Sequence, residues 1–246
     1  MSSALRHRLR EAGGDELSTL LAERSAPLSA EEALLALANP HLDRAGIERL
    51  VELAPLAASR SLARAVALHP RTPEILARRL LPGLPWRDLA EAGRDVRLAP
   101  MVRRAADVLL GERLPGLSPG ERASVARRAA PGLIARFRDE ADPRVAAALL
   151  DNPRLTEGAL LPILSAPRAS PAVLAAVARN RRWGRRAEVR SALVRNPATP
   201  VSASLSLLPH LRKHDLAAVA QDLRLPPAVR RRAALLAGEV AGGVGI

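Results

Sequence analysis

Apolar residues recur along this chain at the spacing of an α-helix. Val102, Ala106 and Leu109 stand at positions i, i+4 and i+7, which places them on one helical face. The same spacing returns in residues 229–236. Alternating patterns typical of strands are almost absent, so helices are predicted throughout. The arginines between the apolar positions are expected on the solvent side of each helix: Arg103, Arg104, Arg230 and Arg231.

A proline turn follows many of the predicted helices. The residue before a proline is pushed out of the α region, and Asn or His occupies that position at four places: Asn39-Pro40, His69-Pro70, Asn152-Pro153 and Asn196-Pro197. Asn also tolerates the left-handed backbone conformation that ends many helices. We therefore expect the first helix of each pair to end at this Asn or His.

Helix start signals come soon after these turns. At three places where Thr or Ser stands directly before a proline, an N-cap hydroxyl and a proline at the first helical position are predicted: Thr72, Thr199 and Ser170. Ser29 and Ser118 are each followed three residues later by Glu, the pattern of a capping box. Asp142, before Pro143, is predicted to start a helix in the same way.

These signals divide the chain into about 15 short helices, each too short to bury its apolar face alone. Stacking such helices in series buries a continuous core. We therefore expect an all-α fold, an α-solenoid of short stacked helices with Asn-Pro and Thr-Pro turns. N-terminal capping helices are expected over residues 1–28, the helical-repeat solenoid over 29–238 and a flexible tail over 239–246.

One long segment of the chain occurs twice. His69–Leu110 and Asn196–Ala237 align without a gap at a shift of 127 positions, and 19 of the 42 residues are identical. The two copies are predicted to form the same three-helix unit. Four leucines and valines of the first copy are expected to be buried together with their partners in the second: Leu80, Leu81, Leu89 and Val102.

Two local motifs resemble known helical-repeat families. Residues 142–149, Asp-Pro-Arg-Val-Ala-Ala-Ala-Leu, resemble the start of a HEAT-type second helix, with Arg144 before Val145 as a departure from the usual order. The Asn-Pro-x-Thr-Pro elements resemble the leucine-rich repeat variant family of bacterial helical solenoids. Residues 171–237 further resemble uncharacterised bacterial helical-repeat proteins. The resemblance implies a fold and hardly restricts function. An iron–sulfur cluster, as in the type member of the variant family, is excluded because the chain has no Cys.

Composition adds few constraints on function. The 246 residues include three aromatic side chains and no Cys, which excludes disulfides, thiolate metal sites and cysteine nucleophiles. No signal peptide or membrane span is visible, so a cytoplasmic protein is expected. The net charge is +13, and all but one of the 38 basic residues are Arg. This excess is as compatible with GC-rich codon bias as with an anionic partner.

The positive charge is concentrated near the C-terminus, where 13 basic and four acidic residues follow from position 179 onward. The densest part is residues 179–186, here called the Arg-rich segment, with five Arg around one Trp. Guanidinium groups pair with phosphates and a Trp can stack on a base. Alternatively, Asn180 marks a degenerate Asn-Pro turn and Trp183 fills the space between two repeats. The candidate binding residues are Arg179, Arg181, Arg182, Trp183, Arg185, Arg186, Arg190, Arg230 and Arg231.

Other polar residues give weaker signals of chemistry. His210 and His214 share a helical face, but no third ligand at motif spacing accompanies them, so no metal or cofactor is expected. Two acids recur in both copies of the repeat, and each is expected to cap backbone N–H groups: Asp88 with Asp215, and Asp95 with Asp222.

The sequence therefore favours a non-enzymatic helical-repeat scaffold that binds an unidentified protein partner. The alternative is a solenoid that binds nucleic acid through a C-terminal Arg-rich face, with duplex backbone contacts because aromatic residues are scarce. A helical-repeat enzyme such as a DNA-base glycosylase would need a catalytic Asp beside aromatic residues, and only residues 86–88, Trp-Arg-Asp, provide that neighbourhood.

Overall fold

The chain is helical throughout the part that the structure describes. The computed structural model describes residues 3–137, 139–166 and 168–242, and these contain no strand. Two more helices than expected are present, and one of them, α10, is a single turn that starts at a proline. The α-helices are α1 (Ser3–Glu11), α2 (Gly14–Ala22), α3 (Ala30–Leu37), α4 (Arg44–Leu53), α5 (Arg60–Ala67), α6 (Glu74–Leu80), α7 (Trp86–Ala92), α8 (Pro100–Arg113), α9 (Pro119–Ala126), α10 (Pro131–Ile134), α11 (Pro143–Leu150), α12 (Glu157–Leu164), α13 (Pro171–Arg179), α14 (Ala187–Arg195), α15 (Val201–Leu207), α16 (Lys213–Gln221) and α17 (Pro227–Gly242). Short 3-10 helices follow five of them: η1 (Leu56–Ala58), η2 (Leu81–Gly83), η3 (Leu114–Gly116), η4 (Ala135–Phe137) and η5 (Leu208–His210).

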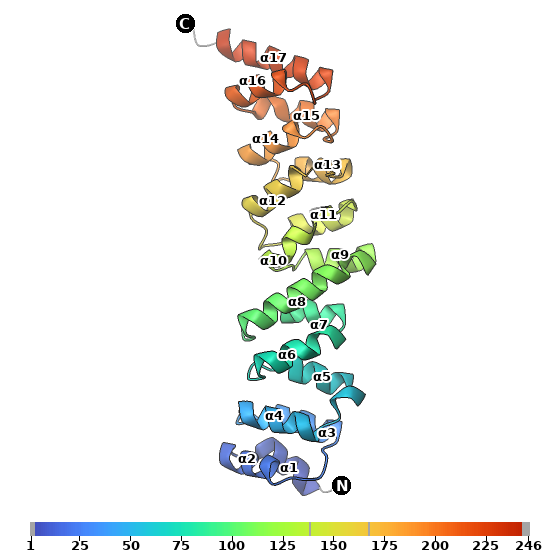
Figure 1. Cartoon of the computed structure of the whole chain (residues 1–246). Helices are drawn as coiled ribbons and strands as arrows, with labels where there is room; N and C mark the ends of the chain where they lie inside the picture. Colours follow the sequence, from blue (N-terminus) through green and yellow to red (C-terminus); the bar gives the residue numbers. More distant parts are fainter. Residues whose placement is uncertain (1–2, 138, 167, 243–246) are drawn as a thin grey trace. The chain divides into compact units, whose positions relative to one another are not determined.

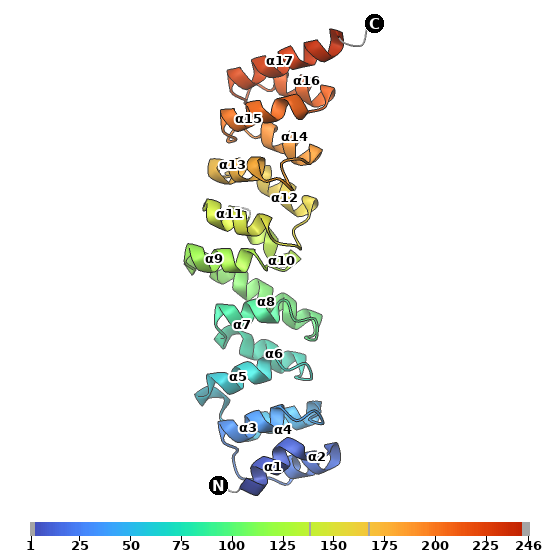
Figure 2. The same cartoon turned by 180° about the vertical axis from the view of Figure 1, so that it is seen from behind.

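The helices form two compact units, residues 1–113 and 114–246. In the first unit, α1 packs on α3 and α3 on α5, while α2 packs on α4. In the second unit, α9, α11, α13, α15 and α17 pack in succession, and α12, α14 and α16 do the same. Many helices thus contact the next helix but one, and consecutive helices such as α7 and α8 or α16 and α17 also pack together (Figures 1 and 2). The boundary between the units falls inside the region 29–238 that was expected to be one solenoid.

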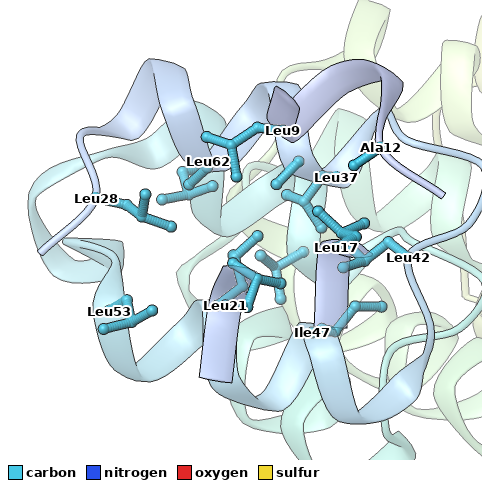
Figure 3. Packing of buried hydrophobic residues seen from close by; sticks show 14 residues of the cluster. Leu9, Ala12, Leu17, Leu21, Leu28, Leu37, Leu42, Ile47, Leu53 and Leu62 are labelled. Carbon is cyan, nitrogen blue, oxygen red and sulfur yellow. The ribbon is translucent and has the colours of Figure 1, made fainter. Parts of the chain in front are cut away.

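The core of the first unit is built almost entirely from leucine and alanine. Leu17 and Leu21 of α2 lie against Ile47 and Leu42, and Leu9 of α1 lies nearby (Figure 3). These side chains are fully buried. Aliphatic side chains fill the narrow space between short helices, which explains how a core forms with three aromatic residues in the chain.

Buried asparagines join a helix to the helix two places before it in the chain. Asn39 follows α3, and its Nδ2 donates to the carbonyl oxygens of Leu9 and Ala12 at the end of α1, at 3.1 and 3.0 Å. Asn152 donates in the same way to two carbonyls at the end of α9, and Asn196 to two at the end of α12. The last carbonyls of a helix have no partner within it. One amide therefore satisfies two of them and ties the two helices together.

The Oδ1 atom of each of these asparagines shapes the turn that follows. It accepts the backbone N–H two residues further on, at 2.8 Å in Asn39, 2.8 Å in Asn152 and 2.9 Å in Asn196. Helices do end within one or two residues of these positions. None of the described residues, glycines included, has a positive φ, so these asparagines do not use the left-handed conformation that Asn tolerates. The side-chain hydrogen bond closes the turn in its place.

The helix start signals are confirmed in part. Ser29 and Ser118 form complete capping boxes, and Asp142 caps α11 by accepting the N–H of Arg144. The prediction for Thr72 and Thr199 is wrong, because the following proline occupies the N-cap position. Each Thr hydroxyl instead donates to a carbonyl oxygen six residues earlier, near the end of the preceding helix.

The hydroxyl of Ser170 also departs from its predicted role. Ser170 stands at the N-cap of α13 with Pro171 at the first helical position, but it makes no side-chain cap bond. Its Oγ donates to the carbonyl oxygen of Ala141 at 3.3 Å. The hydroxyl therefore donates to a carbonyl 29 residues away and does not accept the N–H groups of the first turn of α13.

The two 42-residue copies have their elements at matching positions. α6, η2, α7 and α8 begin 127 residues before α15, η5, α16 and α17. Leu81, Leu89 and Val102 are buried, as are their partners Leu208, Leu216 and Val229 in the second copy, while Leu80 is half-buried. The copies therefore share both helix positions and buried faces.

Three details of α8 and α17, the last helices of the two repeat copies, differ from expectation. The buried stripe of α8 is Val102, Ala106 and Leu110, with Leu109 only half-buried. Arg103 and Arg230 are half-buried, and the Nε atom of each is buried without a hydrogen-bond partner. Both arginines lie in the first turn of their helices and next to the core, so their side chains are not fully exposed to solvent. Finally, α17 continues to Gly242, so residues 239–242 are helical, and 243–246 lie outside the described residues.

Candidate interaction surfaces

The tryptophan of the Arg-rich segment is part of the core. Trp183 is 0% exposed, and its Nε1 donates to the carbonyl oxygen of Leu150 at the end of α11, at 3.1 Å. Asn180 accepts the N–H groups of Arg182 and Trp183. Trp183 thus does what the buried asparagines do elsewhere: it satisfies a helix-end carbonyl of the preceding helix in its row. The idea that this indole stacks on a base is wrong, because a buried ring cannot reach a ligand.

Two of the arginines in this segment are used within the fold. The guanidinium carbons of Arg182 and Arg186 lie 4.6 and 4.8 Å from the centre of the Trp183 ring, within cation–π range. Arg186 also pairs with Glu157 at 2.6 Å. Three exposed arginines of the segment have no ion-pair partner among the described residues: Arg179, Arg181 and Arg185.

The structure does not bring all the candidate arginines together. Trp183 fixes the Arg-rich segment at the C-terminal end of α11, whereas Asn196 is fixed at the C-terminal end of α12. The Arg-rich segment ends directly before α14 and Asn196 follows it, so the two lie at opposite ends of this nine-residue helix, which is about 13 Å long. Arg190 is half-buried with its Nε unpartnered. Arg230 and Arg231 lie near the start of α17, a few residues after Arg224, and Arg224 lines the same cavity as Asn196.

A second surface feature is a turn in which Asp and Arg two residues apart pair with each other. We call these the Asp–Arg turns; they comprise residues 95–97, 142–144 and 222–224. In each turn the Asp Oδ1 accepts the backbone N–H and Nε of the Arg, and Oδ2 accepts Nη2. Such two-bond pairing holds the Arg plane in one orientation. The turn is therefore locked on both the main chain and the side chain.

The ion pair alters the acidity of each carboxyl in these turns. Hydrogen bonds from the Arg side chain, followed by its backbone N–H, lower the pKa of Asp142 and Asp222 to about 2. The pKa of Asp95 is also lowered, first by the hydrogen bond from Arg97. The expectation that Asp95 and Asp222 accept backbone N–H groups is thus confirmed.

In two of the Asp–Arg turns the middle residue is an exposed apolar side chain. Val96 is 79% exposed and Leu223 is 81% exposed, and the two positions correspond at the shift of 127. Val108 and Leu235 correspond in the same way, and both are exposed. The repeated unit therefore presents apolar side chains to solvent at the same places in both copies. The sequence analysis missed this signal, although the alignment of the copies contains it.

The other pair of repeated acids joins neighbouring helices. Asp88 accepts Arg64 Nε at 2.8 Å, and Glu91 accepts the same guanidinium at 2.6 Å. Asp215, the counterpart of Asp88 in the second copy, accepts a hydrogen bond from the hydroxyl of Ser191 at 3.0 Å. Asp88 and Asp215 lie in the first turns of α7 and α16 but are not N-caps, so the predicted capping role is wrong for both. They connect α5 to α7 and α14 to α16.

A groove of about 800 Å³ opens in the second unit. Its walls come from α12, α14 and the two turns that follow α14 and α16. Arg195 and Arg224 both line it, which places the ends of α14 and α16 on the same side of the unit. Sequence reasoning did not find this groove, because its walls come from segments about 30 residues apart.

Searches for other sites and for relatives give little more. No three His, Asp or Glu of the described residues are placed to hold a metal ion. None of the described helices is long and apolar enough to cross a membrane. No protein-family model matches the chain, and neither a curated protein nor a solved structure matches it significantly. The HEAT-like and leucine-rich repeat variant resemblances therefore stay predictions.

Proposed function

We propose that this chain is a non-enzymatic helical-repeat scaffold, an α-solenoid, that binds a partner protein. The packing of many helices on the next helix but one supports this proposal, because helices stacked in series bury a core and leave one face of each unit free. The turns after α3, α11 and α14 are closed by hydrogen bonds to the side chains of asparagines. A partner would therefore meet a surface that is already ordered.

The observation that carries the proposal is the pair of exposed apolar residues on the Asp–Arg turns. A single exposed apolar side chain is ordinary on a protein surface. Here Val96 and Leu223 occupy the same position in two copies, while other surface positions have changed between them, such as Glu74 to Val201. The turn itself needs only the Asp and the Arg. An apolar residue kept between them supports a role in contact with a partner.

The rigidity of these turns favours binding. Association costs free energy when flexible side chains and loops become ordered, about 0.5–1.5 kcal/mol for each immobilised side chain. The Asp–Arg ion pair holds Val96 and Leu223 on turns that are already closed. Most of the ordering cost at these positions is therefore met during folding, and burial of the apolar side chain contributes more fully to affinity.

A comparative pull-down tests this function. The wild-type chain, a Val96→Ser/Leu223→Ser variant and an Arg78→Ser/Arg127→Ser variant are immobilised and exposed to lysate with and without nuclease treatment. We expect a protein retained by the wild type and the arginine variant but lost with the Val96→Ser/Leu223→Ser variant. The arginine variant is the matched control, because it also changes two exposed residues, one in each unit.

Two results would contradict the proposal. One is retention of the same proteins by all three chains, which would remove the apolar positions from binding. The other is that every retained protein disappears on nuclease treatment, which would favour the nucleic-acid alternative.

Binding of nucleic acid keeps support from one observation. Arg179, Arg181 and Arg185 are exposed and unpaired within one short segment, and such clusters attract phosphate. This is a smaller patch than the nine candidate residues together would make, because Trp183 is buried and Arg230 and Arg231 lie in another region. We therefore place it second.

A further inference from the structure

The groove of the second unit exists because small residues replace arginines of the first. At the shift of 127, Ala198 corresponds to Arg71 and Ser191 to Arg64. In the first unit Arg71 Nη1 donates to the carbonyl oxygens of Pro40 and Leu42, so its side chain bridges two successive turns. Arg64 likewise spans to α7. Ala198 and Ser191 both line the groove. Ala198 has no group that could bridge the two turns, and the short side chain of Ser191 reaches Asp215 of α16 but leaves the space that an arginine would fill.

The groove carries one positive charge that is not neutralised nearby. Arg195 makes no ion pair among the described residues, and its charge contributes to lowering the pKa of Asp222. The other charged groups that line the groove are paired: Arg224 with Asp222 at 2.7 Å and Glu188 with Arg212 at 3.4 Å. The site therefore favours a ligand that brings a negative charge to Arg195.

The remaining walls of the groove favour a peptide over a phosphate ion or a nucleic acid. They include Leu161, Ala192 and Pro197, and the exposed Leu223 is adjacent in sequence to Arg224. A volume of about 800 Å³ is within the range of ligand pockets and far larger than one phosphate needs. One unpaired cation beside apolar walls matches a chain in which acidic and apolar side chains are close together.

We propose that the groove of the second unit binds an extended acidic segment of a partner protein, with a carboxylate on Arg195 and an apolar side chain near Leu223. This inference rests on the proposed function, because it specifies the chemistry of the partner at the second Asp–Arg turn. It also gives the two units different roles: the first has its groove filled by its own Arg71, and the second is open.

Fluorescence anisotropy with synthetic peptides tests the inference. The probe is a fluorescein-labelled twelve-residue peptide of glutamate and leucine separated by serine, and a second probe carries lysine in place of glutamate. We expect saturable binding of the acidic probe only. Arg195→Glu should weaken it by about tenfold or more, because a charge-assisted pair is replaced by repulsion.

Ala198→Arg provides an independent test because it restores the arginine that fills the first unit. This variant adds a positive charge yet should also weaken binding of the acidic probe, since the new side chain occupies the groove. Arg181→Glu is the control: it makes the same charge change as Arg195→Glu at an exposed position before α14, whereas Arg195 is the last residue of that helix. It should leave the affinity within about twofold, and circular dichroism should be unchanged in all three variants.

Several outcomes would overturn the inference. These are no binding of the acidic probe, equal binding of the lysine probe, an equal loss with Arg181→Glu, or tighter binding to Ala198→Arg. The last two would show attraction by general charge. If one of these outcomes is observed but the Val96→Ser/Leu223→Ser variant still loses proteins from the lysate, the scaffold function is retained and only the proposal of an acidic partner segment is rejected. If duplex DNA displaces the acidic probe, and the Ala198→Arg variant binds that probe as tightly as the wild type does, the site would be assigned to nucleic acid.

Discussion

Single side chains at the ends of helices hold the rows of this protein together. Asn152 is fully buried and makes three hydrogen bonds, two from its amide and one to its carbonyl oxygen. Trp183 replaces the amide with an indole N–H at the equivalent place after α13. In both cases a donor carried on one helix satisfies carbonyls of another. A buried polar group without a partner costs more than the same bond contributes when formed, so these residues are needed for stability.

Replacing one of these asparagines should destabilise the chain strongly. Asn152→Ala removes both donors and leaves two helix-end carbonyls near α9 without a partner, so we expect a loss of about 2–4 kcal/mol. Urea denaturation followed by circular dichroism measures it. Asp151→Ala changes the exposed neighbour and should stay within about 0.5 kcal/mol. If the two variants unfold at similar urea concentrations, the asparagine does not connect the helices in the way described.

At the scale of an element, the turn after each helix was only partly predictable from sequence. The short range of the proline effect fixes where a helix ends, so the turns at Asn39, Asn152 and Asn196 could be located. The partners of their amides could not be, because the carbonyls lie 23 to 32 residues away and depend on how two helices pack. Thr72 shows the same limit: the local pattern predicts a hydroxyl that accepts an N–H of the following helix, whereas the hydroxyl donates to the carbonyl oxygen of Val66 in the preceding one.

The turn after α5 uses a histidine where similar turns use asparagine, and this makes its stability depend on pH. His69 Nδ1 accepts the N–H of Arg71 at 3.2 Å, which requires the neutral ring. Burial, followed by the charges of Arg71 and Arg97, lowers the pKa of His69. The unfolded chain therefore takes up the proton first as pH falls below about 6.5, and stability is lost from there down through the folded pKa.

The variant His69→Asn should reduce this dependence, because an amide oxygen accepts the same N–H at any pH. We expect the difference in urea midpoint between pH 7.5 and pH 5 to be smaller than in the wild type. His41→Asn, in the turn after α3, is the control, because it makes the same substitution at a histidine of a different turn. An unchanged pH difference in His69→Asn would show that the turn does not sense protonation.

At the scale of the whole molecule, the excess of arginine has a structural use that composition could not indicate. Arg49, Arg71 and Arg113 each donate to two backbone carbonyl oxygens that lie 25 to 31 residues earlier in the chain. A guanidinium has five N–H donors and no acceptor, which suits it to carbonyls left free where short helices end. Many helix ends require many such donors. Net charge is therefore a poor measure of affinity for anions, and only the unpaired arginines count.

The unpaired arginines of the Arg-rich segment give the nucleic-acid alternative a quantitative test. The logarithm of the binding constant for duplex DNA falls with the logarithm of salt concentration, with a slope of about −0.9 for each phosphate contacted. Replacing Arg179, Arg181 and Arg185 by Ser should make the slope smaller by about three if all three contact phosphate. The variant Arg127→Ser/Arg128→Ser/Arg136→Ser removes the same charge from three other exposed arginines of the second unit and should leave the slope unchanged. Equal effects of both variants would mean that duplex DNA responds to net charge alone, and a wild-type chain that heparin does not retain at low salt would end this alternative, because unpaired guanidinium groups at one site must attract a polyanion when screening is weak.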